Sequence, residues 1–247
     1  MTLDRGRILR EMGLGPVWKL RATPAAGPVE AVVEPLPAAV EPLRETTPAI
    51  VPIAPMAPLA AMDWDELAAA VAACRRCRLC EARKQAVLGV GDANADWLFV
   101  GEGPGAEEDQ RGEPFVGQAG KLLDNMLAAI GLKRGEDVYI ANAVKCRPPE
   151  NRTPSAEETA ACRPYLERQI ELIQPKLIVA LGRPAAQTLL QTEVKIAAAR
   201  GKLHDYRGIP LIVTYHPAYL LRTLLDKAKA WEDLCFMKRT MAAQRGG

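Results

Sequence analysis

Short runs of consecutive apolar residues alternate with longer amphipathic stretches over most of the chain. Four runs have the length and composition of strands that are buried on both faces, at 97–100, 138–141, 177–181 and 211–214. Apolar residues at helical spacing fill the intervals, and we expect helices at 62–73, 118–130, 155–173, 184–190 and 227–243. Buried strands separated by helices predict an α/β fold with three layers, α/β/α, around a central four-stranded and mainly parallel sheet.

Two of these helices carry start signals. Asp63 lies at the beginning of the first helix and is a residue type that is favoured at the N-cap. Ser155 is followed three residues later by Glu158, which is the pattern of a capping box. We therefore expect these two helices to begin where the sequence places them.

The first 61 residues follow a different pattern. We expect a short amphipathic helix within residues 1–21, formed around apolar residues such as Ile8 and Leu9. Residues 22–61 hold nine of the chain's 20 prolines. Because proline lacks an amide donor and fixes φ, this composition predicts an extended, disordered linker. The globular domain is expected to cover residues 62–247.

Composition narrows the possible functions. Hydrophobic residues make up 49% of the 247 positions, enough for a packed core, and the net charge is only +2. A nucleic-acid surface would therefore be a local patch rather than a property of the whole chain. No apolar stretch reaches the roughly 20 residues of a membrane span, and the N-terminal residues lack the apolar run of a signal peptide. We expect a cytoplasmic protein whose six cysteines bind metal or stay buried.

Four cysteines have the spacing of a metal site. The first two form a C-x2-C turn, the third follows 69 residues later and the fourth after 16 more: Cys74, Cys77, Cys146 and Cys162. Four thiolates fit zinc or a [4Fe–4S] cluster, and the wide spacing of the second pair favours the cluster. Buried thiols without a metal are a third interpretation. Cys80 and Cys235 are interpreted as ordinary small buried residues.

Residues suited to binding a polar ligand follow three of the predicted strands. A Gly-rich segment begins at Gly101, Asn142 follows the second strand, and His216 closely follows the fourth. Because ligands of parallel sheets bind beyond the carboxyl ends of the strands, these residues are expected to converge. Phe115 lies in a Gly/Pro-rich loop, where it would be a platform for stacking a base or a core residue. The simpler interpretations are a turn at Gly101, a cap at Asn142 and a structural histidine.

Four segments together resemble the family 4 uracil-DNA glycosylases, the iron–sulfur members of their superfamily. They are residues 101–117, 142–148, 162–164 and 216–222, and the similarity covers about residues 64–240. The resemblance implies an enzyme that flips uracil out of DNA and hydrolyses its N-glycosidic bond, which leaves an abasic site. It also implies that the four spaced cysteines hold a [4Fe–4S] cluster.

The resemblance assigns roles to individual residues. The implied substrate-binding set is Gly101, Glu102, Gly103, Phe115, Asn142 and His216. The amides of Glu102 and Gly103 would meet a carbonyl of uracil, and Phe115 would stack on the flipped base. Asn142 would read O4 and N3–H, while His216 would donate to O2.

Three catalytic and three DNA-contacting residues follow from the same resemblance. The implied catalytic residues are His216, Asn142 and Glu108, with Glu108 near C5 of the base, where it would exclude the methyl group of thymine. Leu220, Leu221 and Arg222 would fill the gap in the helix and hold phosphate. Family 1 enzymes carry an aspartate at the position of Gly103 to orient the attacking water. That role would fall to Glu107, Glu108 or Asp109, or to no base.

Other functions stay open on the sequence alone. A related branch of the superfamily traps uracil-DNA covalently through a histidine in a basic insert, and a non-catalytic iron–sulfur protein could bind uracil-DNA with the same fold. Residues 148–154 hold no histidine, which disfavours the trap. An oxidoreductase is disfavoured because the chain has no recognisable nucleotide-cofactor fingerprint. The expected partner is uracil-containing DNA, single- or double-stranded, and the expected state is a monomer.

Overall fold

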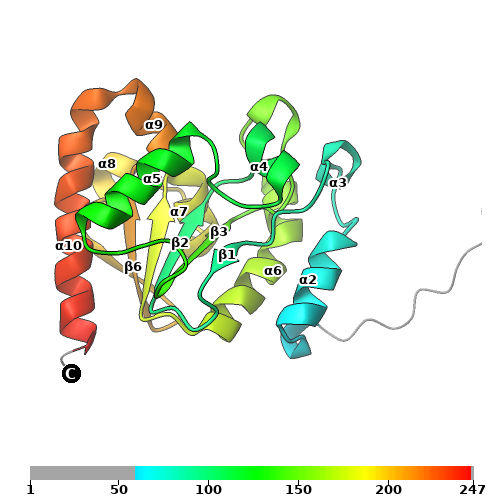
Figure 1. Cartoon of the computed structure of the whole chain (residues 1–247), viewed down its shortest axis with the longest axis horizontal. Coiled ribbons are helices and arrows are strands. Elements are labelled where there is room, and N and C mark those ends of the chain that lie inside the picture. Colours follow the sequence, from blue (N-terminus) through cyan, green and yellow to red (C-terminus); the bar gives the residue numbers. More distant parts are fainter. Residues whose placement is uncertain (1–58, 246–247) are drawn as a thin grey trace, which may run out of the picture. The chain divides into compact units, whose positions relative to one another are not determined.

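A computed structural model describes residues 59–245 (Figure 1). The helix expected within residues 1–21 and the linker expected over residues 22–58 lie outside the described residues. Leu59–Ala61, which the prediction assigned to the linker, form a short 3-10 helix, η1. Between residues 59 and 245, no helix combines the length and apolar character needed to cross a bilayer.

The centre of the domain is a six-stranded sheet with the strand order β1-β3-β2-β4-β6-β5. Its four middle strands are parallel and match the predicted ones: β2 (Trp97–Gly101), β3 (Val138–Asn142), β4 (Leu177–Leu181) and β6 (Ile209–Thr214). Every residue of β2, β3 and β4 is buried, as expected for strands covered on both faces. The predicted α/β class with a mainly parallel sheet is confirmed.

The sheet has two more strands than the four predicted, and both are antiparallel edge strands. β1 (Val90–Gly91) pairs with β3 and is only two residues long. β5 (Leu203–Tyr206) pairs with β6; two of its four residues are exposed, and it lacks the apolar run of the middle strands. Arg207 and Gly208 both have positive φ and connect β5 to β6 as a two-residue hairpin turn.

The five predicted helices are found within two residues of their expected ends. They are α2 (Trp64–Ala72), α5 (Gln118–Ala129), α6 (Ala156–Ile173), α7 (Arg183–Leu190) and α10 (Lys227–Arg245). The caps of Asp63 and Ser155 are both present, each with its reciprocal glutamate bond. Shorter helical segments were not predicted: α3 (Leu79–Ala82), α4 (Ala106–Arg111), η2 (Pro149–Asn151), α8 (Ile196–Ala199), α9 (Pro217–Arg222) and η3 (Leu224–Asp226).

The sheet separates two apolar cores. Alternate residues along the strands face opposite sides, so Phe99 packs with α5, α9 and α10 whereas Leu98 packs with α6 and α7. Figure 1 shows α5 and α10 on one side of the sheet, with α6 on the other and α2 outside it. A third cluster joins α2 to α6 and includes Cys146 and Cys162. The predicted three layers are therefore confirmed, with α2 added beyond them.

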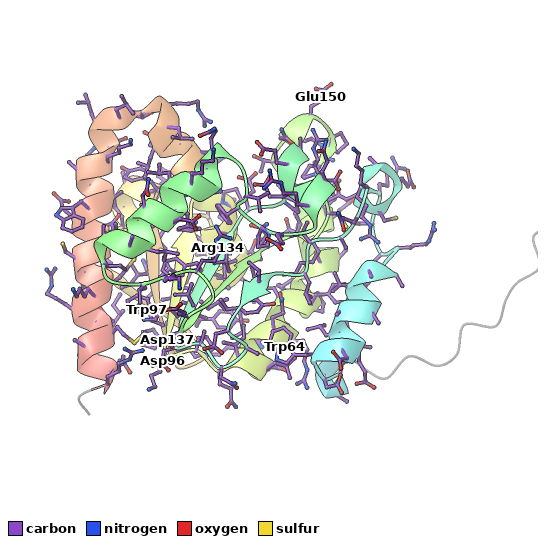
Figure 2. The ribbon with its side chains drawn as sticks, in the orientation of Figure 1. Trp64, Asp96, Trp97, Arg134, Asp137 and Glu150 are labelled. Atoms are coloured by element: carbon purple, nitrogen blue, oxygen red, sulfur yellow. The ribbon has the colours of Figure 1, made fainter. Side chains whose placement is uncertain are left out.

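The amino ends of the strands are closed by charged contacts far from the ligand-binding end. Figure 2 labels Asp96 and Asp137 together with Trp97 at the start of β2. Arg245, near the end of α10, bonds Asp96 at 2.7–2.9 Å and also pairs with Asp137. Asp137 in turn accepts the Asp96 amide at 2.7 Å. These contacts hold the last helix to the sheet and leave the carboxyl ends of the strands free for function.

Candidate active site

Gly101 and Asn142 lie side by side at the carboxyl ends of β2 and β3, where they are register partners. A Cβ atom on Gly101 would lie 2.4 Å from Asn142 Oδ1 and 2.6 Å from the ring of Phe115. No side chain fits in that space, so glycine is needed at this position for the other two residues to approach. The predicted convergence at this end of the sheet is confirmed.

Phe115 is buried and has φ of +55°, a conformation that bulky residues rarely adopt. Holding such a residue there costs about 1–3 kcal/mol and needs support from the surroundings. The Phe115 ring lies 5.5 Å from the ring of His216, centroid to centroid, with an angle of 30° between the planes. The aromatic residue and the histidine from two distant segments therefore meet beside Gly101.

His216 follows β6 and is the N-cap of α9. Its Nδ1 accepts a hydrogen bond of 3.1 Å from the amide of Ala218. Burial and, to a smaller extent, the charge of Arg222 lower the pKa of His216 to about 4, although Glu108 acts in the opposite direction. The imidazole is therefore neutral at pH 7, and because Nδ1 is an acceptor, its single proton is on Nε2. His216 thus presents a neutral N–H donor.

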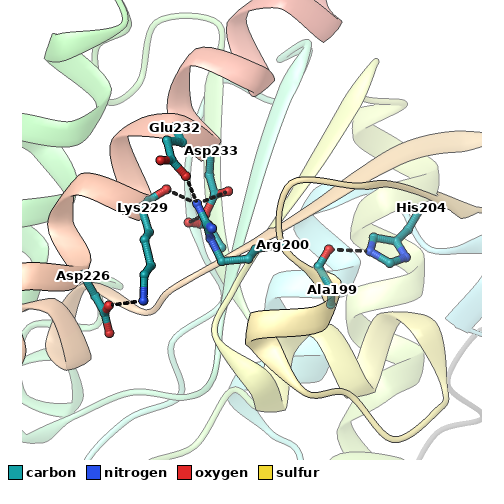
Figure 3. A network of polar contacts seen from close by, with 8 residues as sticks. Ala199, Arg200, His204, Asp226, Lys229, Glu232 and Asp233 are labelled. Atoms are coloured by element: carbon teal, nitrogen blue, oxygen red, sulfur yellow. Dashed lines mark hydrogen bonds and ion pairs between the residues drawn. The ribbon is translucent and has the colours of Figure 1, made fainter.

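Contacts to His216 itself and to the end of β6 before it fix the position of this residue. Gly182, at φ +88°, passes so close behind it that a Cβ there would lie 2.9 Å from the His216 Cβ. Thr214, two residues before it, donates to the buried Asp233 at 2.7 Å. Figure 3 shows Arg200 bonded to Asp233 in the same network, and the Arg200 guanidinium also lies 5.8 Å from the centre of the Tyr215 ring. The end of β6 is therefore held from two sides.

Asn142 is almost fully buried, and its Oδ1 has no hydrogen-bond partner among residues 59–245. Its main-chain carbonyl, in contrast, accepts a hydrogen bond of 2.9 Å from the buried Lys145. Buried amide groups in folded proteins are nearly always paired, so an exception needs an explanation. A ligand that donates a hydrogen bond is the simplest one.

The carboxylate of Glu108 is engaged by backbone amides. Its Oε2 accepts from Gly105 at 3.1 Å, and its Oε1 accepts from Val116 at 3.0 Å and from Gly117 at 3.1 Å. Glu108 therefore ties the Gly-rich loop to the Phe115 loop, a role that sequence reasoning missed. The predicted function near C5 of a base stays a prediction.

The acidic residues near the Gly-rich loop differ in their surroundings. Asp109 is buried and accepts the amides of Lys84 and Gln85 at 2.9 and 3.4 Å, so it holds a neighbouring segment. Glu107 is exposed. Burial raises the pKa of Glu102, while a bond from Thr153 and the charge of Arg183 lower it. The Glu102 side chain is thus a further candidate, which the sequence analysis considered only through its backbone.

The structure corrects one part of the predicted DNA-contacting set. Leu220 is 1% exposed and packs into the core between α5 and α10, so it is not placed to fill a gap in DNA. Leu221 is 42% exposed, and Arg222 is exposed as well. Helix α9 is too short for its buried face to be read from the sequence alone.

The four spaced cysteines line one cavity, together with Arg83 and Tyr165 among others: Cys74, Cys77, Cys146 and Cys162. Cys80 and Cys235 are not among the lining residues. The described residues contain no group of three or more ligating side chains placed to hold a single metal ion. Four cysteines around one shared cavity are a ligand set of the kind used by zinc ions and by iron–sulfur clusters.

Two of the sulfurs in this cavity have nitrogen donors. Arg83 Nη1 lies 2.9 Å from Cys146 Sγ, and its other nitrogen donates to the carbonyls of Ala72 and Cys74. The amide of Lys145 donates to Cys162 Sγ at 3.2 Å. Burial raises the pKa of Cys162 to about 12, so this thiol stays protonated unless a cation binds it. Sequence reasoning missed Arg83, because Cys146 lies 63 positions away from it.

Comparisons with known proteins identify the family of this chain. The model of the uracil DNA glycosylase superfamily matches residues 88–235, more than half of the chain. A type-4 uracil-DNA glycosylase of Archaeoglobus fulgidus is 52% identical over 143 residues, which cover 55% of this chain and 71% of that protein. One of Thermotoga maritima is 51% identical over 142 residues, covering 57% and 73%.

The chain belongs to the type-4 uracil-DNA glycosylases. A type-5 uracil-DNA glycosylase of Pyrobaculum aerophilum is less similar, at 35% identity over 146 residues that cover 53% of this chain and 64% of that protein. The resemblance to family 4 that the sequence motifs indicated is therefore confirmed. The matched region contains Gly101, Phe115, Asn142 and His216, which the fold brings together.

Proposed function

We propose that this type-4 uracil-DNA glycosylase binds a flipped uracil beyond the carboxyl ends of β2, β3 and β6 and hydrolyses its N-glycosidic bond. The observation that carries the proposal is the buried Asn142 amide, whose Oδ1 lacks a partner among residues 59–245 beside Gly101 and Phe115. Uracil offers the N3–H donor that this oxygen lacks, and its O4 accepts from the amide nitrogen. Cytosine has the opposite pattern at both positions and is rejected.

The remaining groups complete the base pocket. The amides of Glu102 and Gly103 bind a uracil carbonyl, and the Phe115 ring stacks on the base. The Glu108 carboxylate lies near C5 and excludes the methyl group of thymine. It is held in place by the amides of Val116 and Gly117.

His216 stabilises the leaving group. Cleavage leaves negative charge on uracil, and the neutral Nε2–H of His216 donates to O2 as that charge develops. A donor fixed before the reaction needs no reorganisation, and one such donor is typically worth ~10²–10³ in rate. The low pKa of His216 leaves the group neutral at physiological pH, and the Ala218 amide that donates to Nδ1 leaves the single proton on Nε2.

Glu102 is proposed as the group that orients the attacking water. Gly103 provides no side chain for this role, and Asp109 and Glu108 are both engaged by backbone amides. The raised pKa of Glu102 suits a carboxylate that accepts a proton. Replacement by glutamine should lower the single-turnover rate without changing affinity for DNA, and an unchanged rate would remove Glu102 from the mechanism.

Cys74, Cys77, Cys146 and Cys162 would hold a [4Fe–4S] cluster. Their shared cavity and the Arg83 and Lys145 donors at its sulfurs support this assignment. When bound, the cluster would supply a cross-link between the segments that carry its ligands, since hydrolysis moves no electrons. Cys146 lies four residues after Asn142, so the cross-link would steady the loop that reads uracil.

The partner is uracil-containing DNA, single- or double-stranded, which Leu221 and Arg222 contact beside His216. The glycosylase domain is proposed to cover residues 62–247, with the preceding segment outside the catalytic unit. We further propose a cytoplasmic monomer. Deleting residues 1–58 should leave activity on short oligonucleotides largely intact, and a large fall in turnover at unchanged iron content would contradict the domain assignment.

The deciding experiment uses an end-labelled oligonucleotide with a single uracil, and matched ones with cytosine or thymine. Release of free uracil, followed by strand cleavage in alkali, supports the glycosylase. The alternative is a non-catalytic or covalently trapping protein. It would give a shifted band without free uracil, or a protein–DNA adduct that survives denaturation.

A further inference from the structure

The Phe115 loop is held by two side chains of opposite charge. On one side, Glu108 accepts hydrogen bonds from the amides of Val116 and Gly117, at 3.0 and 3.1 Å. On the other, Arg134 donates to the carbonyls of Pro114 and Phe115, at 2.9 and 2.8 Å. Backbone groups of four consecutive residues are therefore bonded to a carboxylate or a guanidinium.

Arg134 is itself fixed in place. It belongs to the connection between α5 and β3 and is labelled in Figure 2. Its Nε donates to Asp124 of α5 at 2.9 Å, and its side chain is only 23% exposed. The planar guanidinium reaches both carbonyls and the carboxylate at once, which a lysine ammonium does not do. The geometry is therefore specific to arginine.

The loop needs this support because Phe115 has φ of +55°. The Phe115 carbonyl also lies so close to α5 that a Cβ on Gly120 would be 1.7 Å from its oxygen. Arg134 therefore bonds the carbonyl of the one residue in the site whose backbone is strained and whose ring contacts His216. Without that bond, the strained conformation loses its main polar partner on this side.

We propose that Arg134 is a positioning residue, which acts on the reaction only by holding Phe115 in its left-handed conformation against the base. The inference rests on the proposed function, since the effect on rate is transmitted through a base-stacking ring. It adds a residue outside the pocket, 19 positions after Phe115, to the determinants of activity.

The test compares Arg134→Gln with Lys133→Gln. Both remove one positive charge from the same loop, but Lys133 is exposed and pairs with the exposed Glu136 rather than with the Phe115 loop. We expect Arg134→Gln to lower the single-turnover rate on uracil-DNA by about 10²-fold, the scale for a misplaced catalytic geometry. Lys133→Gln should keep the wild-type rate, and Arg134→Lys should recover part of the loss.

A double-mutant cycle separates positioning from general stability. In a Phe115→Ala background, Arg134→Gln should lower the single-turnover rate by less than about threefold, because the ring through which Arg134 acts is gone. An equal fold-loss in both backgrounds would overturn the proposal, and so would identical rates for Arg134→Gln and Lys133→Gln.

Hydrogen exchange gives a readout that does not depend on activity. The amides of Val116 and Gly117 should exchange at least about tenfold faster in Arg134→Gln than in Lys133→Gln or wild type, as the loop opens. Unchanged exchange would overturn the proposal. If the wild-type protein released no uracil, the proposed function would fail, and the exchange rates would still decide whether Arg134 holds the loop.

Discussion

The buried ammonium of Lys145 donates a hydrogen bond of 2.9 Å to the main-chain carbonyl of Asn142, and it also bonds the side-chain oxygen of Gln169. Lys145 is only 1% exposed and directly precedes Cys146. One side chain thus connects the strand end that carries the proposed uracil-reading amide with the helix that carries Cys162. Strand β3, helix α6 and the cysteine cavity are coupled through it.

Lys145→Met should therefore destabilise the domain. Methionine has a similar length but leaves the Asn142 carbonyl and the Gln169 oxygen without their donor, and each unpaired buried acceptor costs about 1–3 kcal/mol. Removing a buried charge offsets part of that cost. We expect a net loss of about 1–3 kcal/mol in denaturant unfolding, against no measurable loss for the exposed Lys133→Met. Equal midpoints for the two variants would show that Lys145 has no such role.

The shared cysteine cavity leads us to predict the iron content of the protein. Protein purified without oxygen should be brown and hold iron and sulfide near four per chain, as expected of one [4Fe–4S] cluster. Serine at Cys77 or Cys162 should remove most of the iron, while alanine at Cys80 or Cys235 should leave it unchanged, since neither lines the cavity. Stoichiometric zinc without visible absorbance, or iron loss in Cys80→Ala, would contradict the ligand assignment.

Asn142→Asp should loosen the discrimination between uracil and cytosine. A protonated aspartic acid donates to cytosine N3 and accepts from its amino group, which reverses the pattern of the amide. Because the carboxyl must be protonated, any release of cytosine should increase as the pH falls. Asn142→Ala serves as the control, because it lacks both groups and should act poorly on either base. Wild-type activity on uracil in Asn142→Asp would exclude Asn142 from the site.

The sequence predicts the parts of this molecule that depend on local pattern. The four middle strands are recognisable because each is apolar on both faces, and their parallel order places Gly101, Asn142 and His216 at one end. The edge strand β5 escapes prediction because it has no run of apolar residues, and two of its four residues are exposed. It is held by pairing with β6, which no local pattern reveals.

The supporting contacts of the site depend on residues that are distant in sequence. Arg134 meets the Phe115 carbonyl across 19 positions, and Lys145 meets Gln169 across 24. A lone arginine or lysine in a sequence resembles any solvated charge, so only the fold shows that these two are buried or partly buried. The prediction that Leu220 contacts DNA was wrong for a related reason, because a helix of six residues does not show from its sequence which face is buried.

His216 should also make stability depend on pH. Its pKa is about 4 in the folded protein against an ordinary value of 6.5, through burial and Arg222, with Glu108 opposing. Between these values the unfolded chain binds a proton that the folded protein does not bind, so stability increases with pH over this window. The contribution is full above about pH 6.5 and is lost as the pH falls towards 4. In calorimetry, lowering the pH from about 7 to about 5 should reduce the melting temperature of His216→Ala by less than that of the wild type. Parallel losses would mean that His216 titrates normally.

His216→Ala should lower the single-turnover rate on uracil-DNA by about two to three orders of magnitude, the effect of removing one preorganised donor. Affinity for DNA should change little, because binding is dominated by phosphate contacts. The matched control is His204→Ala. His204 lies in β5 with its Nε2 2.9 Å from the Ala199 carbonyl (Figure 3), away from the carboxyl ends of the strands. Similar rates for the two variants would exclude the Nε2–H donor, and stabilisation of the leaving group would then rest on the amides of Glu102 and Gly103.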